Sequence, residues 1–174
     1  FTDALRSELL HDHSRVHVTM VQMPALNTPQ FDWARNKMPR RPQPVPPIFE
    51  PEVAAEAIVF AAHARRREVF VGGSTVAAII ANRLAPGLLD RYLARNGYRG
   101  QLTQEANPGG PDNLFAPVAG DRGAHGRFDA LAQRKSAEFW MVRHRGLLAA
   151  GLVALVATLL TGWPSRVAAR ARSR

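Results

Sequence analysis

The 174-residue chain contains no cysteine. This absence excludes a disulfide framework and a metal centre built on thiolates. It is compatible with the reducing cytosol but does not require that compartment. A chain of this length can bury one sizeable core without covalent crosslinks. We therefore expect a folded domain with a hydrophobic core rather than a small fold held together by disulfide bonds.

Acidic side chains are scarce, with 14 Asp and Glu against 23 Lys and Arg. Residues 1–105 carry 13 basic and 10 acidic side chains, whereas residues 106–174 carry 10 and 4. The excess of positive charge therefore belongs mainly to the second part of the chain. The basic clusters Arg40-Arg41 and Arg65–Arg67 lack the interleaved aromatics that stack on bases. They favour a solvated loop and helix end, and we expect no nucleic-acid partner.

The chain opens on a helix pattern, with apolar residues at Phe1, Leu5 and Leu9. This spacing predicts a helix whose apolar stripe faces a core. The strand-like run Val16–Met23 follows at once, which is typical of an α/β fold. Because no turn or cap residue precedes Phe1, we expect the chain to be the carboxy-terminal part of a larger domain.

Prolines dominate the next segment, Pro24–Pro47, and argue against a continuous helix or a ladder strand there. We expect a long loop with a short helix around Gln30–Lys37. A second helix is predicted to begin at Pro51, where proline is tolerated in the first turn, and to run to His63. The run Glu68–Val71 predicts a short strand that ends at two glycines.

Beyond this strand the pattern becomes helical, then irregular. Residues 74–102 predict one or two amphipathic helices with a break at Ala85-Pro86-Gly87. Residues 104–127 are rich in Gly, Pro, Asn and Asp, which predicts a mobile linker. Residues 128–144 predict a further helix, which begins a helical tail at 128–174.

The run Gly146–Trp163 contains 18 residues and no charge. As a helix it would span about 27 Å, close to the thickness of a thin bilayer. Three roles fit it: a transmembrane anchor, an interfacial helix, or a segment that docks on another protein. We favour insertion, because an interfacial helix needs a polar face and this run offers only two threonines. Basic residues flank both ends, so its orientation cannot be assigned.

The order of elements in residues 1–73 resembles the short-chain dehydrogenase/reductase family. The opening Phe-Thr-Asp-Ala-Leu-Arg-Ser-Glu-Leu resembles the continuation of that family's catalytic helix. The strand and loop Met-Val-Gln-Met-Pro-Ala-Leu-Asn-Thr, ending at Thr28, resemble its cofactor loop, and the helix and strand that follow keep the family's order. The resemblance implies the C-terminal part of a Rossmann-type doubly wound parallel sheet over residues 1–103, followed by a helical extension and a hydrophobic C-terminal helix.

The resemblance also implies a cofactor site for NAD or NADP in the loop after the first strand. Pro24, Ala25, Leu26 and Thr28 would line the carboxamide end of the nicotinamide. The sequence departs from the family in two ways: Ala25 replaces the usual Gly, and Thr28 comes one residue early. The alternative is that the prolines merely end the strand and that Thr28 caps the next short helix.

A substrate lid is expected directly after this loop. Phe31, Trp33 and Met38 would shape an apolar cover beside the nicotinamide. The alternative for these three residues is local packing of the proline-rich loop. A metal was considered at His11-x-His13, but histidines at a helix end favour the helix dipole, and we expect no metal site.

Two motifs that the chemistry requires are missing. The Gly-x-Gly-x-x-Gly loop that holds the pyrophosphate is absent, because Gly120, Gly123 and Gly126 have the wrong spacing. The family's catalytic Tyr-x-x-x-Lys is absent too, since Tyr92 and Tyr98 are followed four positions later by Asn96 and Leu102. We therefore expect no catalytic residue in this chain and place both motifs upstream of it.

The resulting hypothesis is the C-terminal portion of an NAD(P)-dependent oxidoreductase that interconverts an alcohol and a carbonyl on a small molecule. It would be inactive alone, attached to the cytoplasmic face of a membrane through residues 146–163, or otherwise cytoplasmic. A homodimer through the first helix is expected from the family. The alternative is a non-catalytic, membrane-associated interaction module, a truncated remnant of the same fold.

Overall fold

The computed structural model describes residues 1–110 and 112–171, and it describes side chains as far as residue 160. It divides into two compact units, Phe1–Phe139 and Trp140–Arg174. The first unit takes in the whole predicted linker and the start of the predicted tail. Residue 111 of that linker and residues 172–174 of that tail lie outside the described residues.

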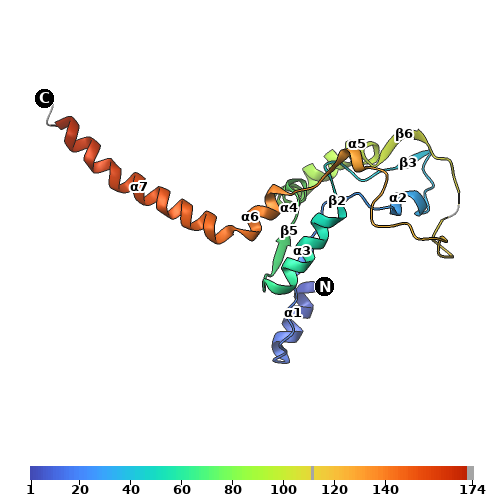
Figure 1. Ribbon diagram of the computed structural model, residues 1–174, viewed down its shortest axis with the longest axis horizontal. Coiled ribbons are helices and arrows are strands. Elements are labelled where there is room, and N and C mark those ends of the chain that lie inside the picture. The colour runs from blue at the N-terminus through green and yellow to red at the C-terminus, as the bar shows by residue number, and fades with distance from the viewer. Residues whose placement is uncertain (111, 172–174) are drawn as a thin grey trace. The chain divides into compact units, whose positions relative to one another are not determined.

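The first parallel sheet joins β1 (Met20–Gln22) to β5 (Glu68–Phe70), with Val21 opposite Val69. Helix α3 (Pro51–His63) packs against this sheet (Figure 1). Val69 and Val71 are fully buried, and each buried valine side chain contributes about 1.5–3 kcal/mol. The helix predicted from Pro51 to His63 is confirmed, and so is the strand at Glu68 to within one residue; of the strand-like run Val16–Met23 only Met20–Gln22 is a strand. The buried face of α3 consists of Val53, Ala54, Ala57 and Ala61.

A second parallel sheet has the order β2 (Ala25–Leu26), β4 (Ile48–Phe49) and β7 (Ala132–Gln133). Ile48 and Phe49 are buried at its centre. The sequence predicted loop at β2 and β4 and helix at β7, and these predictions were wrong. Strands of two residues leave no alternating pattern, and Pro24 and Pro47 lie just outside them, where the missing N–H costs no ladder bond.

A third pair is antiparallel and joins β3 (Arg40–Pro42) to β6 (Leu102–Ala106). Backbone bonds extend the pair on both sides, from Gln43 N–H to Gln101 O at 2.9 Å and from Asn107 N–H to Pro39 O at 3.0 Å. The predictions of no ladder strand in the proline-rich segment and of a linker at 104–106 were therefore wrong. Both strands are edges of a two-stranded ribbon, where Pro42 is tolerated. Helix α2 (Gln30–Trp33) precedes β3, as predicted for a short helix in this loop.

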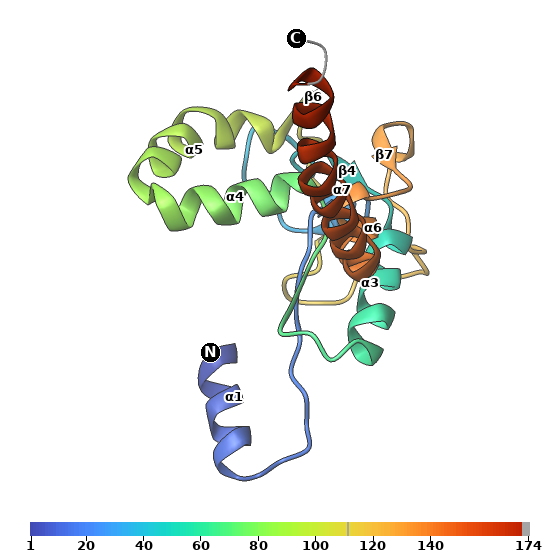
Figure 2. The same cartoon turned by 90° about the vertical axis from the view of Figure 1, so that its left-hand side faces the viewer.

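Three helices lie outside this core. They are α1 (Thr2–His11), α4 (Gly73–Leu84) and α5 (Pro86–Gly100), and none of them contains a buried residue. Helices α4 and α5 form a hairpin with a break at Ala85, as predicted (Figure 2). The prediction that Phe1, Leu5 and Leu9 face a core was wrong for this chain. Phe1 is fully exposed, and Leu5 and Leu9 are only half-buried.

The end of the first unit is irregular rather than a helix over 128–144. A 3₁₀ turn, η1 (Asp129–Leu131), leads into β7, and α6 (Ala137–Arg143) begins only after the buried Ser136. The Ser136 hydroxyl accepts the N–H of Phe139 at 3.1 Å, which caps the start of α6. The described part of the chain is an α/β structure with small parallel sheets, and the doubly wound Rossmann-type sheet stays a prediction.

The second unit contains α7 (Arg145–Ala171). Its side chains from Arg145 to Leu160 are exposed within that unit. Within the described residues, no single helix has the length and hydropathy of a membrane span, but α6 and residues Arg145–Leu160 together do, with a bend of 81° between them. Side chains 161–163 of the predicted span lie outside the described residues.

Candidate functional site

A cavity of about 490 Å³ lies where β2, α2 and the segment after β3 meet. It contains all four residues predicted to contact a nicotinamide, namely Pro24, Ala25, Leu26 and Thr28. One predicted lid residue, Phe31, lines it too. The remaining lining residues were not singled out by the sequence: Gln30, Gln43, Pro44, Val45 and Gln101. The β3–β6 pairing, extended by the bond from Gln43 N–H to Gln101 O, places Gln101 beside Gln43.

The ten residues around this cavity are all uncharged. The polar side chains are the Thr28 hydroxyl and three glutamine amides, which can both donate and accept hydrogen bonds, and the other lining side chains are apolar. Gln43 is held in place, because its Nε2 donates to Gly100 O at 3.1 Å. The loop turns tightly at Thr28, whose N–H donates to Leu26 O at 3.0 Å. The lining therefore offers hydrogen-bond donors and acceptors of the kind that pair with an amide, but no general acid or base.

The other two predicted lid residues lie elsewhere. Trp33 borders a second cavity of about 660 Å³, and the Arg122 guanidinium lies 5.8 Å from the centre of its ring. The Met38 sulfur accepts a weak hydrogen bond from the Tyr98 hydroxyl at 3.9 Å. Neither residue lines the cavity of Thr28 and Phe31.

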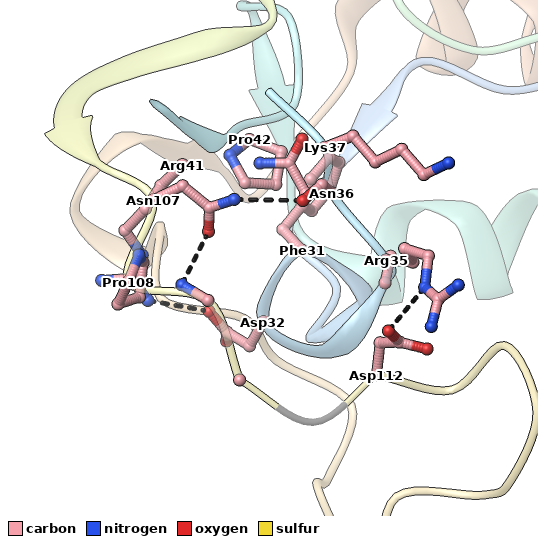
Figure 3. A pocket seen from close by; sticks show the side chains of 13 residues that line it. Phe31, Asp32, Arg35, Asn36, Lys37, Arg41, Pro42, Asn107, Pro108 and Asp112 are labelled. Carbon is pink, nitrogen blue, oxygen red and sulfur yellow. Dashed lines mark hydrogen bonds and ion pairs between the residues drawn. The ribbon is translucent and has the colours of Figure 1, made fainter. Parts of the chain in front are cut away.

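A polar hollow of about 240 Å³ shares Phe31 with that cavity (Figure 3). Two ion pairs join charged side chains of its lining: Arg35 Nε to Asp112 Oδ2 at 2.7 Å and Arg41 Nη2 to Asp32 Oδ1 at 3.5 Å. The hydrogen bond from Arg35 holds the pKa of the Asp112 carboxyl below its ordinary value. Asn107 closes one side by donating to Asn36 O and Met38 O, each at 3.1 Å. These groups stabilise the loops around α2.

Asn27 lies behind the cavity wall and is fully buried. Its N–H donates to Phe49 O at 2.8 Å, and its Oδ1 accepts the N–H of Phe128 at 3.0 Å. Its Nδ2 donates to Glu50 Oε2 at 3.2 Å and to Asp129 Oδ1 at 2.6 Å. Sequence reasoning missed this residue, because one asparagine between Leu26 and Thr28 forms no pattern.

A cluster of ionisable groups lies beside Asn27. His125 Nε2 is 2.7 Å from Glu52 Oε1, and its Nδ1 is 3.5 Å from Glu50 Oε2 and 3.9 Å from Asp129 Oδ1. The hydrogen bond to Glu52 raises the pKa of His125, and the same bond lowers the pKa of the Glu52 carboxyl. One ligand atom each from Glu50, His125 and Asp129 lies within 4.8 Å of the others. Asn27 and Glu52 bind the same groups, so these residues form one network of hydrogen bonds and ion pairs.

The strength of the contact between His125 and Glu52 is expected to depend on pH. Folding raises the pKa of His125, so the stabilisation is complete below the ordinary histidine value of about 6.5 and is lost as the pH rises through the folded-state pKa. Glu52, whose pKa is lowered, stays ionised over that range. Hydrogen exchange at the Gly126 amide, after correction for intrinsic rate, should increase as the pH rises through this window. In H125Q the dependence should vanish, and an unchanged profile in this variant would contradict the assignment.

Comparisons with known proteins give one informative similarity. No family model matches the chain, and no solved structure matches it. Among curated proteins, it is similar to the uncharacterized oxidoreductase YxnA of Bacillus subtilis (strain 168), with 30% identity over 129 residues. The matched region covers 72% of this chain and 36% of that protein. The chain thus spans about a third of the length of the curated relative.

Proposed function

We propose that this chain forms the C-terminal part of an NAD(P)-dependent short-chain oxidoreductase that interconverts an alcohol and a carbonyl. The observation that carries the proposal is the cavity lined by Pro24, Ala25, Leu26, Thr28 and Phe31. The similarity to a curated oxidoreductase supports the general class. The family within that class and the cofactor rest on the sequence resemblance.

The lining residues fit the carboxamide end of a nicotinamide. A carboxamide has one acceptor and two donor positions, and the Thr28 hydroxyl and the cavity amides can pair with both kinds. Phe31 and Val45 would contact the apolar part of a small alcohol or carbonyl substrate. When bound, the cofactor supplies or accepts the hydride. These residues would orient the ring and exclude water from it.

In this proposal, residues outside this chain must supply two functions of a complete enzyme: proton transfer and binding of the cofactor phosphates. The cavity lining has no ionisable side chain to move a proton, and the sequence has no Gly-x-Gly-x-x-Gly loop to hold phosphates. By the family resemblance, these residues are a Tyr-x-x-x-Lys pair and a glycine-rich loop. Their place would be upstream of Phe1.

The test begins with the intact mass and N-terminal sequence of the protein from its own cells, followed by nicotinamide absorbance assays with a panel of small alcohols. A longer chain with both motifs and turnover is the expected result. In that full-length protein, T28V should weaken cofactor binding by about three- to tenfold, the value of one hydrogen bond. T103V, which removes a hydroxyl from β6, is the control. A native chain without both motifs, or without cofactor binding, would overturn the proposal in favour of a non-catalytic interaction module.

We also propose that residues 146–163 attach the protein to a membrane. The exposed apolar side chains of α7 from Leu147 to Leu160 support this role. The expected result is retention in the membrane pellet after an alkaline wash of fractionated cells. Complete release into the supernatant would contradict membrane insertion. This proposal stands separately from the catalytic one, since a non-catalytic module could use the same anchor.

A further inference from the structure

Residues Gly126–Phe128, which we call the bracket, bind the back of the cavity wall. The Gly126 N–H donates to Asn27 O at 3.1 Å, and the Phe128 N–H donates to Asn27 Oδ1 at 3.0 Å. Asn27 stands between the lining residues Leu26 and Thr28. The bracket therefore fixes the backbone of the proposed nicotinamide loop through residues that do not line the cavity.

Arg127 connects this loop to the other wall. Its Nη2 donates to Pro42 O at 2.7 Å, one residue before the lining residue Gln43. Its Nη1 forms an ion pair with Asp32 and a long hydrogen bond to Phe31 O at 3.5 Å. One guanidinium thus holds α2 and the end of β3 at a fixed spacing, which its planar donor geometry favours over that of a lysine.

Phe128 supports the lining residue Phe31 directly. The two rings are edge to face, with centroids 6.0 Å apart, and Phe128 is buried. The Arg127 guanidinium lies 4.8 Å from the centre of the Phe128 ring. The orientation of Phe31 therefore depends on a side chain almost a hundred residues later in the sequence.

Gly126 lies against the wall without space for a side chain. A Cβ atom added there would be 2.6 Å from Thr28 O and 2.9 Å from Asn27 Oδ1. Both are shorter than real Cβ contacts, and one of the two atoms is backbone, so a methyl group must displace either the bracket or Thr28. A methyl group at Gly126 is therefore expected to move the cavity wall at Thr28 directly.

We propose that Gly126, Arg127 and Phe128 are positioning residues that hold the two walls of the cavity at the spacing needed for productive binding of the substrate. This inference rests on the proposed oxidoreductase function. The bracket touches neither cofactor nor substrate; it acts through Asn27, Phe31 and Pro42. It also gives a function to a segment whose composition predicts a linker.

The test compares G126A with G87A in the full-length protein. The added methyl of G87A meets no atom within 4 Å, so it controls for the chemical change. We expect G126A to raise the KM for the carbonyl substrate about tenfold and to lower kcat less, because a small displacement of the wall misplaces the substrate. G87A should retain both values.

A second pair of variants keeps the test valid if G126A folds poorly. R127K retains the charge beside Asp32, but its donors lie on one nitrogen and cannot span Asp32 and Pro42 O as the two guanidinium nitrogens do. Its KM should therefore lie between those of the wild type and R127A. R95A, which removes an exposed arginine from α5, is the control. Hydrogen exchange should accelerate at the amides of residues 25–28, 30 and 31 in R127A, while the amides of β1 and β5 keep their protection.

The outcomes separate this inference from the function on which it rests. A wild-type protein without turnover overturns the proposed function. Turnover in the wild type, with a KM in G126A and R127A equal to that of G87A and R95A, overturns the bracket. Faster exchange without a change in KM overturns it as well, because the bracket would then support the fold only.

Discussion

The N27A variant is expected to lose about 2–4 kcal/mol of free energy of unfolding, because several buried groups lose their partner at once. Asn27 is fully buried and bonds to Glu50, Asp129 and the Phe128 N–H. Alanine would leave the buried Glu50 carboxylate and that N–H without the amide, and it would open a small void. Urea denaturation followed by circular dichroism measures the loss.

Two further variants identify the cause. N96A removes an exposed asparagine whose Nδ2 donates to Tyr92 O within α5, and it should cost less than about 0.5 kcal/mol. N27D keeps the acceptor for Phe128 but places a carboxylate beside Glu50 and Asp129. Its destabilisation should therefore decrease as the pH falls, because protonation of the new carboxylate at position 27 removes the repulsion. A loss in N27A no larger than in N96A would show that Asn27 does not hold this part of the fold.

The second large effect is expected at Gly72, where β5 turns into α4. Its φ of +82° is one that residues with a side chain rarely adopt. An added Cβ would lie 3.0 Å from Pro24 Cβ and 3.2 Å from Phe49 Cε2. Strain and overpacking together predict that G72A loses about 2–4 kcal/mol of free energy of unfolding.

The control for G72A is G87A, in the first turn of α5. There the added methyl meets no atom within 4 Å, and alanine favours a helix over glycine by about 1 kcal/mol. The same substitution should therefore destabilise at one glycine and stabilise at the other. Thermal denaturation of both variants measures this difference. Equal midpoints would mean that the turn at Gly72 relaxes without moving Pro24 and Phe49.

The sequence predicted those elements whose pattern is long or marked by special residues. Helix α3 was found because Val53, Ala57 and Ala61 recur at helical spacing after Pro51. Strands β2, β4 and β7 have two residues each, too few for any period. Periodicity also did not reveal whether the stripe of α1 has a partner, since it reports which residues share a face and not what covers that face.

The site was predictable only where its residues are neighbours in the chain. Pro24, Ala25, Leu26 and Thr28 follow one another, so one loop pattern was enough to group them. Gln101 reaches the same cavity through the β3–β6 pairing, and no local sequence pattern predicts that pairing. Arg127 pairs with Asp32 from a segment rich in Gly and Asp, whose composition is that of a linker. An ion pair between residues so far apart in the chain produces no periodic pattern in the sequence.

The parallel pairing of β4 with β7 means that the second sheet can be completed only late in the synthesis of this unit. Ile48 meets Ala132 only after residues 49–131 have been synthesised, and closing so long a loop is slow. Until then Ile48-Phe49 presents one open strand edge, to which another nascent chain could add. Helix α3 and strand β5 can assemble much earlier. Translation that stalls before Ala132 would thus release a chain with its first sheet formed and its second sheet unfinished.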